Sequence, residues 1–365
     1  MGSSVIASEP SDRTLQEEAD REAEQLSRTA KIHDEPALDS YLATIVSRLM
    51  AGSPLASDAP PIRVTVLRDV APSAFMLPNG RLFVHTGLLA RLDNEAQLAA
   101  ILGRETVHLT ERHALRADRN APDTSAQAVS SPIPAQGLPL TYTAAVTGYG
   151  RDLEREGDAG GLTRVARAGY DPREALLAFE RLREEPGHPS RSERYYLSHR
   201  ARLDERLAGA RKWLQTNGSE TSLEAFTRGS EDYALRTRLA VRENAGLEIR
   251  AGRYGLGRSQ LDRVLSLTPE DPVAHLYYGD LHRLAAQRTR RPEDRAPLIE
   301  QARAAYARAI ALDPAFPDPF RQLGFLYFQT RDNPRAREAF ERYLALDPDA
   351  PDAQRVREYL IELER

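Results

Sequence analysis

The segment with the clearest chemical character is residues 101–113, ILGRETVHLTERH. In an α-helix, positions i and i+4 lie on one face, so residues 104 and 108 share a face and Glu105 lies one step round. The motif His-Glu-x-x-His uses this spacing to place two zinc ligands beside a general base. Glu105 and His108 occupy their positions here, but Arg104 stands at the first ligand position. The segment therefore predicts a metal-binding helix in which one ligand has become a cation.

A second acidic segment supplies a candidate third ligand. A catalytic zinc site needs three protein ligands and an open position, and we expect the third ligand from another helix. The candidate is Glu154, in the segment RDLEREGD at 151–158. Asp158 follows at i+4 on the same face, where a carboxylate can hold a ligand histidine in one tautomer.

Arg104 opposes zinc binding for a physical reason. A guanidinium has no lone pair to donate and stays protonated. At about 4 Å, a unit charge repels a divalent cation by roughly 8 kcal/mol at an effective dielectric constant of about 20. One hypothesis is that Arg104 replaces the charge of the metal and pairs with Glu154, Glu105 or Asp158. The alternative stays open, because an outward-pointing Arg104 would leave His108 and Glu154 free to bind zinc with a further histidine.

Composition excludes several classes of function. The chain has 365 residues, 41% hydrophobic and 28% charged, which predicts two domains with a sizeable core. The formal net charge of −4 argues against nucleic acid as a partner. The chain has no cysteine, so disulfides, thiolate metal sites and cysteine nucleophiles are excluded. No apolar run has the length of a membrane span, and the first residues of this sequence do not predict a signal peptide.

The pattern of the first two thirds of the chain predicts an α+β domain that is mainly α. Residues 16–50 show helical periodicity with a break at Asp34-Glu35-Pro36, and residues 86–117 are helical. A strand is expected at 62–67, and two short strands at 75–77 and 82–84 flank a turn at Pro78-Asn79-Gly80. These strands predict a small sheet.

The last third of the chain contains a repeat. The segment AIALDP at 309–314 recurs as YLALDP at 343–348, a shift of 34 residues, which is the tetratricopeptide period. Gly279 and Gly324 are 45 residues apart, so we expect an insertion around residues 287–297 that separates the two helices of the preceding repeat. We expect a tail at 1–15, a domain at 16–230 and a solenoid of tetratricopeptide-like repeats at 231–365.

Several motifs together resemble a known family. They are TVLRDVAPSAFMLPNGRLFVHTGLL, NEAQLAAILGRETVHLTERH, YGRDLEREGD, RAGYDP and LSHRARLDER. They resemble the zinc-dependent gluzincin family of CAAX prenyl proteases, HtpX and the periplasmic BepA-type enzymes. The order of a protease domain followed by tetratricopeptide hairpins is also similar to the BepA-type arrangement.

The resemblance implies a role for each matching residue. His108 matches the second zinc ligand, Glu105 the general base and Glu154 the third ligand. Asp158 matches a partner of a ligand histidine, and His199 resembles a histidine that such enzymes bring near the metal as an extra ligand or transition-state donor. The stretch of Ser73, Ala74, Phe75 and Met76 resembles the strand edge that aligns an extended peptide.

The chain departs from the family pattern around this site. The departures are Arg104 for the first ligand, Ser73 for Asn, Gly150 for Ser, Gly157 for Ala and Arg200 for Pro. The first departure removes a ligand. The resemblance therefore implies a zinc family in which this chain is catalytically impaired and its zinc can be absent.

We expect a metallopeptidase-family protein of envelope protein quality control. In this hypothesis it binds peptides at the groove edge and a protein partner on the tetratricopeptide face. The alternative is an active zinc endopeptidase that degrades misfolded proteins, with metal on His108, Glu154 and His199 and with Glu105 as base. A third hypothesis is a scaffold that binds only through its repeats. The resemblance implies export to the periplasm or envelope, with membrane association through an N-terminal signal or anchor that this sequence lacks.

Overall fold

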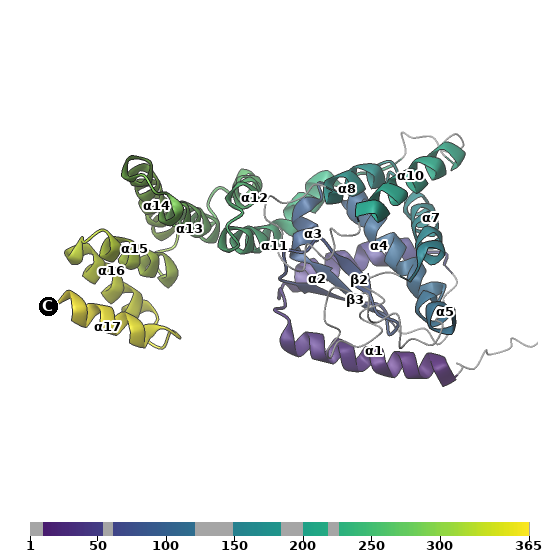
Figure 1. Ribbon diagram of the computed structural model, residues 1–365, viewed down its shortest axis with the longest axis horizontal. Helices are drawn as coiled ribbons and strands as arrows, with labels where there is room; N and C mark the ends of the chain where they lie inside the picture. The colour runs from purple at the N-terminus through teal and green to yellow at the C-terminus, as the bar shows by residue number, and fades with distance from the viewer. Residues whose placement is uncertain (1–9, 54–60, 121–148, 184–199, 218–225, 365) are drawn as a thin grey trace, which may run out of the picture. The chain divides into compact units, whose positions relative to one another are not determined.

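The computed structural model describes residues 10–53, 61–120, 149–183, 200–217 and 226–364. The chain divides into two compact units, residues 1–240 and 241–365, and the division falls within helix α11 (Ser230–Arg250). The expected boundary after residue 230 lies at the start of the same helix. The expected α+β fold that is mainly helical is confirmed, with one small sheet in the first unit and helical repeats in the second (Figure 1).

The sheet of the first unit has three strands, β1 (Arg63–Leu67), β2 (Ala74–Met76) and β3 (Arg81–His85). Their order is β1-β3-β2, with β1 parallel and β2 antiparallel to β3. The turn between β2 and β3 ends at Gly80, whose φ of 79° suits glycine. Strand β2 is an edge strand, as a peptide-aligning strand must be.

The helices of the first unit surround this sheet. They are α1 (Pro10–Thr29), α2 (Pro36–Met50), α3 (Thr86–Arg91), α4 (Glu95–Thr110), α5 (His113–Asn120), α7 (Arg151–Arg167), α8 (Glu174–Arg183) and α10 (Arg200–Asn217). Helix α1 begins inside the segment expected to be a tail. Proline suits the first turn of a helix, because the N–H that it lacks has no partner there, and an i,i+4 pair of Arg13 and Glu17 follows.

The expected helix at 86–117 is divided into three helices for local reasons. Asn94 accepts a hydrogen bond from the N–H of Gln97 at 2.9 Å and caps α4, so α3 ends before it. Helix α4 ends before Arg112, whose φ of 51° is left-handed and incompatible with a continuing helix. The helix that carries the motif therefore has defined ends on both sides.

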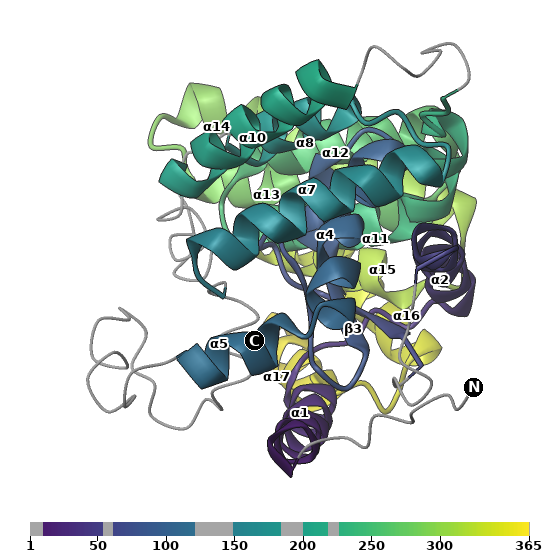
Figure 2. The ribbon, with the colours of Figure 1, turned by 90° about the vertical axis from the view of Figure 1, so that its right-hand side faces the viewer.

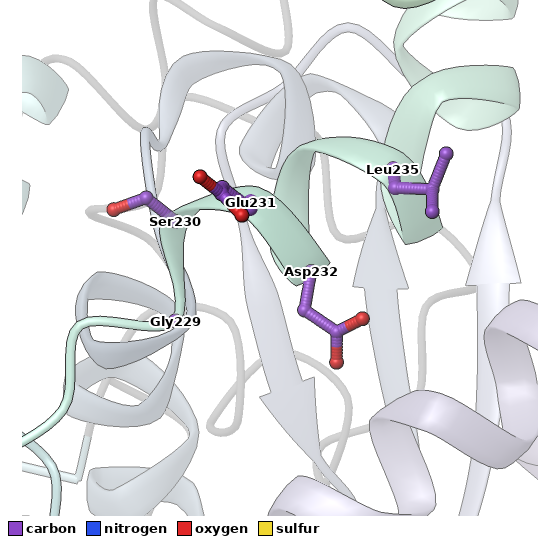
Figure 3. A pocket seen from close by; sticks show the side chains of 5 residues that line it. All are labelled: Gly229, Ser230, Glu231, Asp232 and Leu235. Carbon is purple, nitrogen blue, oxygen red and sulfur yellow. The ribbon is translucent and has the colours of Figure 1, made fainter.

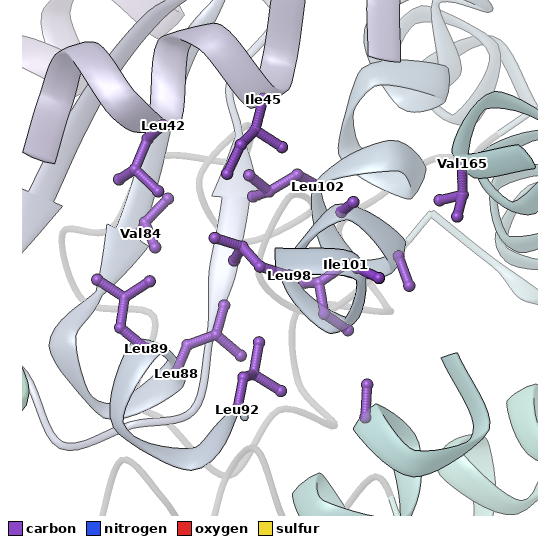
Figure 4. Packing of buried hydrophobic residues seen from close by; sticks show 14 of the residues in the cluster. Leu42, Ile45, Val84, Leu88, Leu89, Leu92, Leu98, Ile101, Leu102 and Val165 are labelled. Atoms are coloured by element: carbon purple, nitrogen blue, oxygen red, sulfur yellow. The ribbon is translucent and has the colours of Figure 1, made fainter. Parts of the chain in front are cut away.

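Two hydrophobic clusters lie on the two sides of the sheet. A small cluster joins α1 to the sheet through Ala19, Ala23, Leu67, Phe75, Leu77 and Phe83. The main core joins α2, α3, α4 and α7 to the strands, and Figure 4 shows its members Leu42, Ile45, Val84, Leu88, Leu89, Leu92, Leu98, Ile101, Leu102 and Val165. Helix α4 is buried along most of its length, so its side chains are held firmly.

The second unit contains helical hairpins. After the end of α11 it holds α12 (Tyr254–Leu267), α13 (Pro272–Arg288), α14 (Pro292–Leu312), α15 (Pro317–Gln329), α16 (Asn333–Leu346) and α17 (Ala353–Leu363). Gly279 lies against the ring of Tyr306, and Gly324 against the ring of Phe340. The expected insertion at 287–297 does not separate the two helices: α13 and α14 extend into it and leave only residues 289–291 between them.

No helix within the described residues is long and apolar enough to cross a membrane.

A substitution at Gly279 tests the hairpin packing. A Cβ there would overlap the ring of Tyr306, so we expect Gly279→Ala to lower the free energy of unfolding by about 1–3 kcal/mol. Gly255→Ala is the matched control, because a Cβ at that helical position meets nothing within 4 Å. The control should be neutral or more stable by up to about 1 kcal/mol. Denaturant titration followed by circular dichroism measures both, and equal midpoints would contradict the described contact.

Candidate active site between helices α4 and α7

Helices α4 and α7 approach closely because glycines line their contact (Figure 2). A Cβ at Gly161 would lie 2.8 Å from the backbone nitrogen of Arg104, and one at Gly103 would lie 3.0 Å from the carbonyl oxygen of Gly161. A Cβ at Gly157 would lie 2.9 Å from Cε1 of His108. Without side chains at these positions, the functional groups of the two helices come within bonding distance.

Arg104 points into the site and bonds to carboxylates from both helices. Its Nη1 donates to Oε1 of Glu105, and its Nη2 donates to Oε2 of Glu154. Its Nε lies 3.7 Å from Oδ1 of Asp158. The side chains of Arg104, Glu154 and Asp158 are each less than one fifth exposed. The guanidinium therefore lies among the carboxylates, in the position of a central cation.

Asp158 has a different partner from the one expected. It was expected to hold a ligand histidine, but both of its oxygens accept from Nε of Arg206 on α10, at 2.9 and 3.1 Å. The guanidinium of Arg206 also stacks on the ring of Phe179, 4.2 Å from its centroid. The physical reason is that a planar guanidinium satisfies a carboxylate better than one ring nitrogen does. The sequence predicts no role for Arg206, although this residue lies in the motif LSHRARLDER.

His108 is buried and faces a second histidine. Its Nδ1 lies 2.6 Å from Nδ1 of His113, and its ring packs on that of Tyr149 with centroids 4.9 Å apart. Its Nε2 is buried, makes no hydrogen bond with the described residues, and lies 3.9 Å from Oε1 of Glu154. His113 was given no direct role from sequence, yet it fixes the orientation of His108. The i,i+5 spacing of the two histidines is the sequence signal that could have predicted this contact.

Glu105 contacts the edge of the sheet. Its Oε2 accepts from the backbone N–H of Met76 in β2 at 3.2 Å, and its side chain is 2% exposed. The expected peptide-aligning stretch Ser73–Met76 therefore lies beside the site. Phe75 and Met76 are buried, and Ala74 and Ser73 are half-buried. The backbone N–H of Met76, on the edge strand β2, is therefore already bonded to Glu105.

The charges of the site explain how its groups titrate. Burial alone would lower the pKa of Arg104, but Glu154, Glu105 and Asp158 raise it above its ordinary value. Burial would raise the pKa of Glu154, but Arg104 and His108 hold it below its ordinary value. Burial raises the pKa of Glu105, Arg104 lowers it and Glu154 raises it again, which leaves it at about 7.

The pKa of His108 is lowered well below its ordinary value, first by burial and then by Arg104. The imidazole is therefore neutral. Two arginines, Arg104 and Arg206, then balance the charges of Glu154 and Asp158, and Glu105 is the surplus carboxylate.

The described residues do not fit a zinc ion. A catalytic zinc site takes three protein ligands, and no group of three His, Asp or Glu in the described ranges is arranged to hold a metal. His108 and Glu154 are both present, but Arg104 donates hydrogen bonds where a ligand would offer a lone pair. His199 lies outside the described residues.

A separate shallow pocket lies at the start of α11 (Figure 3). It is lined by Gly229, Ser230, Glu231, Asp232 and Leu235, and it includes none of the residues of the α4–α7 site. Glu231 and Asp232 stand in the first turn of α11, where carboxylates stabilise a helix N-terminus. The position of these two carboxylates is therefore explained by the stability of the helix, without a ligand.

A methyl group at position 157 tests the geometry of the α4–α7 site. Because its Cβ would lie 3.0 Å from Nε2 of His108 and 3.4 Å from Cγ of Arg104, we expect Gly157→Ala to lower the free energy of unfolding by about 1–3 kcal/mol. Gly209→Ala on α10 is the matched control, since its Cβ meets nothing within 4 Å. Thermal melts of both variants measure the difference, and an unchanged Gly157→Ala melt would refute the close contact.

Comparisons with known proteins agree with the architecture. The family model of peptidase family M48 matches residues 36–213, and a tetratricopeptide repeat model matches residues 295–360. The chain is 28% identical over 252 residues to the beta-barrel assembly-enhancing protease of Escherichia coli (strain K12), covering 65% of this chain and 48% of that protein.

A second group of relatives is mitochondrial. The chain is 29% identical over 182 residues to the mitochondrial metalloendopeptidase OMA1 of Schizosaccharomyces pombe, covering 48% of this chain and 52% of that protein. The chain spans about half the length of these curated relatives. These matches confirm the resemblance that the motifs indicated. The chain therefore carries a domain of peptidase family M48 followed by a tetratricopeptide repeat region.

Proposed function

We propose that this chain is a pseudopeptidase of the M48 family in which Arg104 takes the place of zinc. The supporting observation is that one guanidinium bonds both to Glu105, the counterpart of the general base, and to Glu154, the counterpart of the third ligand. With Arg104 in this position, neither carboxylate is free for the chemistry that the family performs with it.

A cation at this position stabilises the buried carboxylates. Carboxylates that are buried without a cation are costly, and removing one partner of a buried pair destabilises by about 3–5 kcal/mol. An internal cation keeps the fold of α4 and α7 intact without a metal. The protein then acts by binding, with β2 as the edge for an extended peptide and the repeats as the surface for a protein partner.

The setting that we propose is protein quality control in a bacterial envelope. It rests on the similarity to the beta-barrel assembly-enhancing protease and on the shared order of peptidase domain and repeats. The substrate class is then a misassembled or misfolded protein, held rather than cut.

A second candidate function is an active zinc endopeptidase with metal on His108, Glu154 and His199 and with Glu105 as base. The observation that favours it is the Nε2 of His108, a buried ring nitrogen with no hydrogen bond among the described residues and 3.9 Å from Glu154. In this alternative Arg104 turns away from the site and releases both carboxylates.

Zinc content distinguishes the two candidates. We expect the purified chain to contain no zinc and Arg104→His to contain close to one zinc per chain, because the substitution restores the missing ligand beside His108 and Glu154. Elemental analysis of both proteins, purified without added metal, is the measurement. The control is Arg104→His combined with His108→Ala, which should lose the metal again. Zinc bound to the unsubstituted chain would overturn the proposal and favour the endopeptidase.

The stability of an Arg104 variant tests the role of the cation separately. We expect Arg104→Leu to lose about 3–5 kcal/mol of unfolding free energy, because Glu154 and Glu105 remain buried without their partner. Adding Glu154→Gln should recover part of this loss. Arg155→Leu is the matched control, since its side chain is 65% exposed and its pair with Asp152 contributes at most about 1 kcal/mol. Urea denaturation measures all three, and a stable Arg104→Leu protein would count against the metal-substitute role.

A further inference from the structure

The second unit has two edges of opposite charge. Successive helices of a repeat hairpin run antiparallel, so their connections alternate between the two edges of the solenoid. One edge carries the connections α11–α12, α13–α14 and α15–α16. The other edge carries the connections α12–α13, α14–α15 and α16–α17.

Exposed arginines gather on the first edge. We call them the arginine edge: Arg250, Arg288, Arg290, Arg291, Arg295 and Arg331. Contacts bring several of them together across the hairpins. The guanidinium of Arg288 lies over Gly252 and 5.3 Å from the ring centroid of Tyr254, and Arg250 lies 6.0 Å from the ring centroid of Tyr277.

The arginine edge is not neutralised from within. None of its six members forms an ion pair with an acidic side chain of the described residues, and their one side-chain hydrogen bond there runs from Arg295 to the carbonyl oxygen of Thr289 at 3.3 Å. Glu293, Asp294 and Asp332 lie on the same edge, and Asp332 is engaged with Arg335. The edge therefore keeps an excess of positive charge that faces solvent.

The opposite edge has the reverse composition. Its connections at 267–272, 312–318 and 346–353 contain no lysine or arginine. Their carboxylates are Glu270, Asp271, Asp313, Asp318, Asp347, Asp349 and Asp352. Several are already bonded within the unit. Asp271 pairs with Arg242 at 2.9 Å and caps α13, and Asp352 accepts from Tyr343 at 2.6 Å and from Arg321.

The difference in charge between the two edges indicates an anionic partner for the arginine edge. Asp271 and Asp352 of the acidic edge are engaged internally, which lowers the negative charge that a second copy of the chain offers to the arginine edge. A row of helix turns is a ridge and suits a flat surface, whereas repeat proteins hold peptides in their concave face. Tyr254, which lies under the guanidinium of Arg288, and Leu256, which is 36% exposed, both belong to the first turn of α12. Arginine with tyrosine and leucine at one edge is the composition of a membrane-interface surface.

We propose that the arginine edge docks the second unit on an anionic phospholipid surface. Each guanidinium presents two parallel N–H donors to a lipid phosphate, and Tyr254 and Leu256 enter the headgroup layer beside them. The acidic edge is repelled by the same surface, so the unit binds in one orientation. The proposal does not depend on Arg104 or on zinc, and it goes beyond the pseudopeptidase function.

Vesicle flotation with the full chain tests the proposal. We expect co-flotation with phosphatidylcholine vesicles that contain phosphatidylglycerol and none with phosphatidylcholine alone. Each arginine near an anionic surface changes the partition coefficient by about fivefold, so Arg290→Glu with Arg291→Glu should lower it by more than about tenfold. Both side chains are exposed and form no hydrogen bond or ion pair with the described residues, so the fold should remain, as circular dichroism can show. A second variant, Arg250→Glu with Arg331→Glu, removes charge from the other two connections and should also weaken binding.

The matched control is Arg308→Glu with Arg342→Glu, which changes the net charge by the same amount on the exposed faces of α14 and α16. It should float almost as well as the unsubstituted chain, and raising the salt concentration should release all forms. Equal loss in the control and the edge variants would overturn the proposal, as would equal binding to both kinds of vesicle. Retention on an immobilised acidic peptide without any flotation would assign the edge to a protein partner and would also overturn it.

Discussion

The site between α4 and α7 depends on one buried cation. The guanidinium of Arg104 joins Glu105 of its own helix to Glu154 of the next, and Arg206 from a third helix satisfies Asp158. Three carboxylates are therefore held by two arginines, and burial keeps the pKa of Glu105 raised, at about 7, although Arg104 lowers it. Because unpaired charges in a buried site are costly, the positions of these two guanidinium groups determine which carboxylates can remain buried there.

The glycines of the helix contact make this balance possible. Gly157 and Gly161 leave space for Arg104 and His108, and Gly103 lets the backbones approach. A cation as large as a guanidinium fits between two helices only where neighbouring side chains are absent. The same closeness brings Glu105 against the edge strand β2, where its Oε2 accepts a hydrogen bond from the backbone N–H of Met76.

In the second unit, the repeated hairpins place basic and acidic residues on opposite edges. Hairpins of similar length place alternate connections on opposite edges, and the composition of those connections makes one edge basic and the other acidic. Internal ion pairs such as Arg242 with Asp271 engage carboxylates of the acidic edge and leave exposed arginines on the other. The chain thus combines a buried site whose carboxylates pair with two arginines and an edge whose arginines are not neutralised by ion pairs within the described residues.

The sequence alone predicted the elements and the family. The helical spacing of Arg104, Glu105 and His108 and the 34-residue period are local, so they can be read without a structure. Only the tertiary structure decided that Arg104 turns inward, that Asp158 binds Arg206, and that His113 holds His108. These pairings join helices far apart in the chain or depend on side-chain rotamers. Such choices are fixed by packing and charge balance, which no local pattern contains.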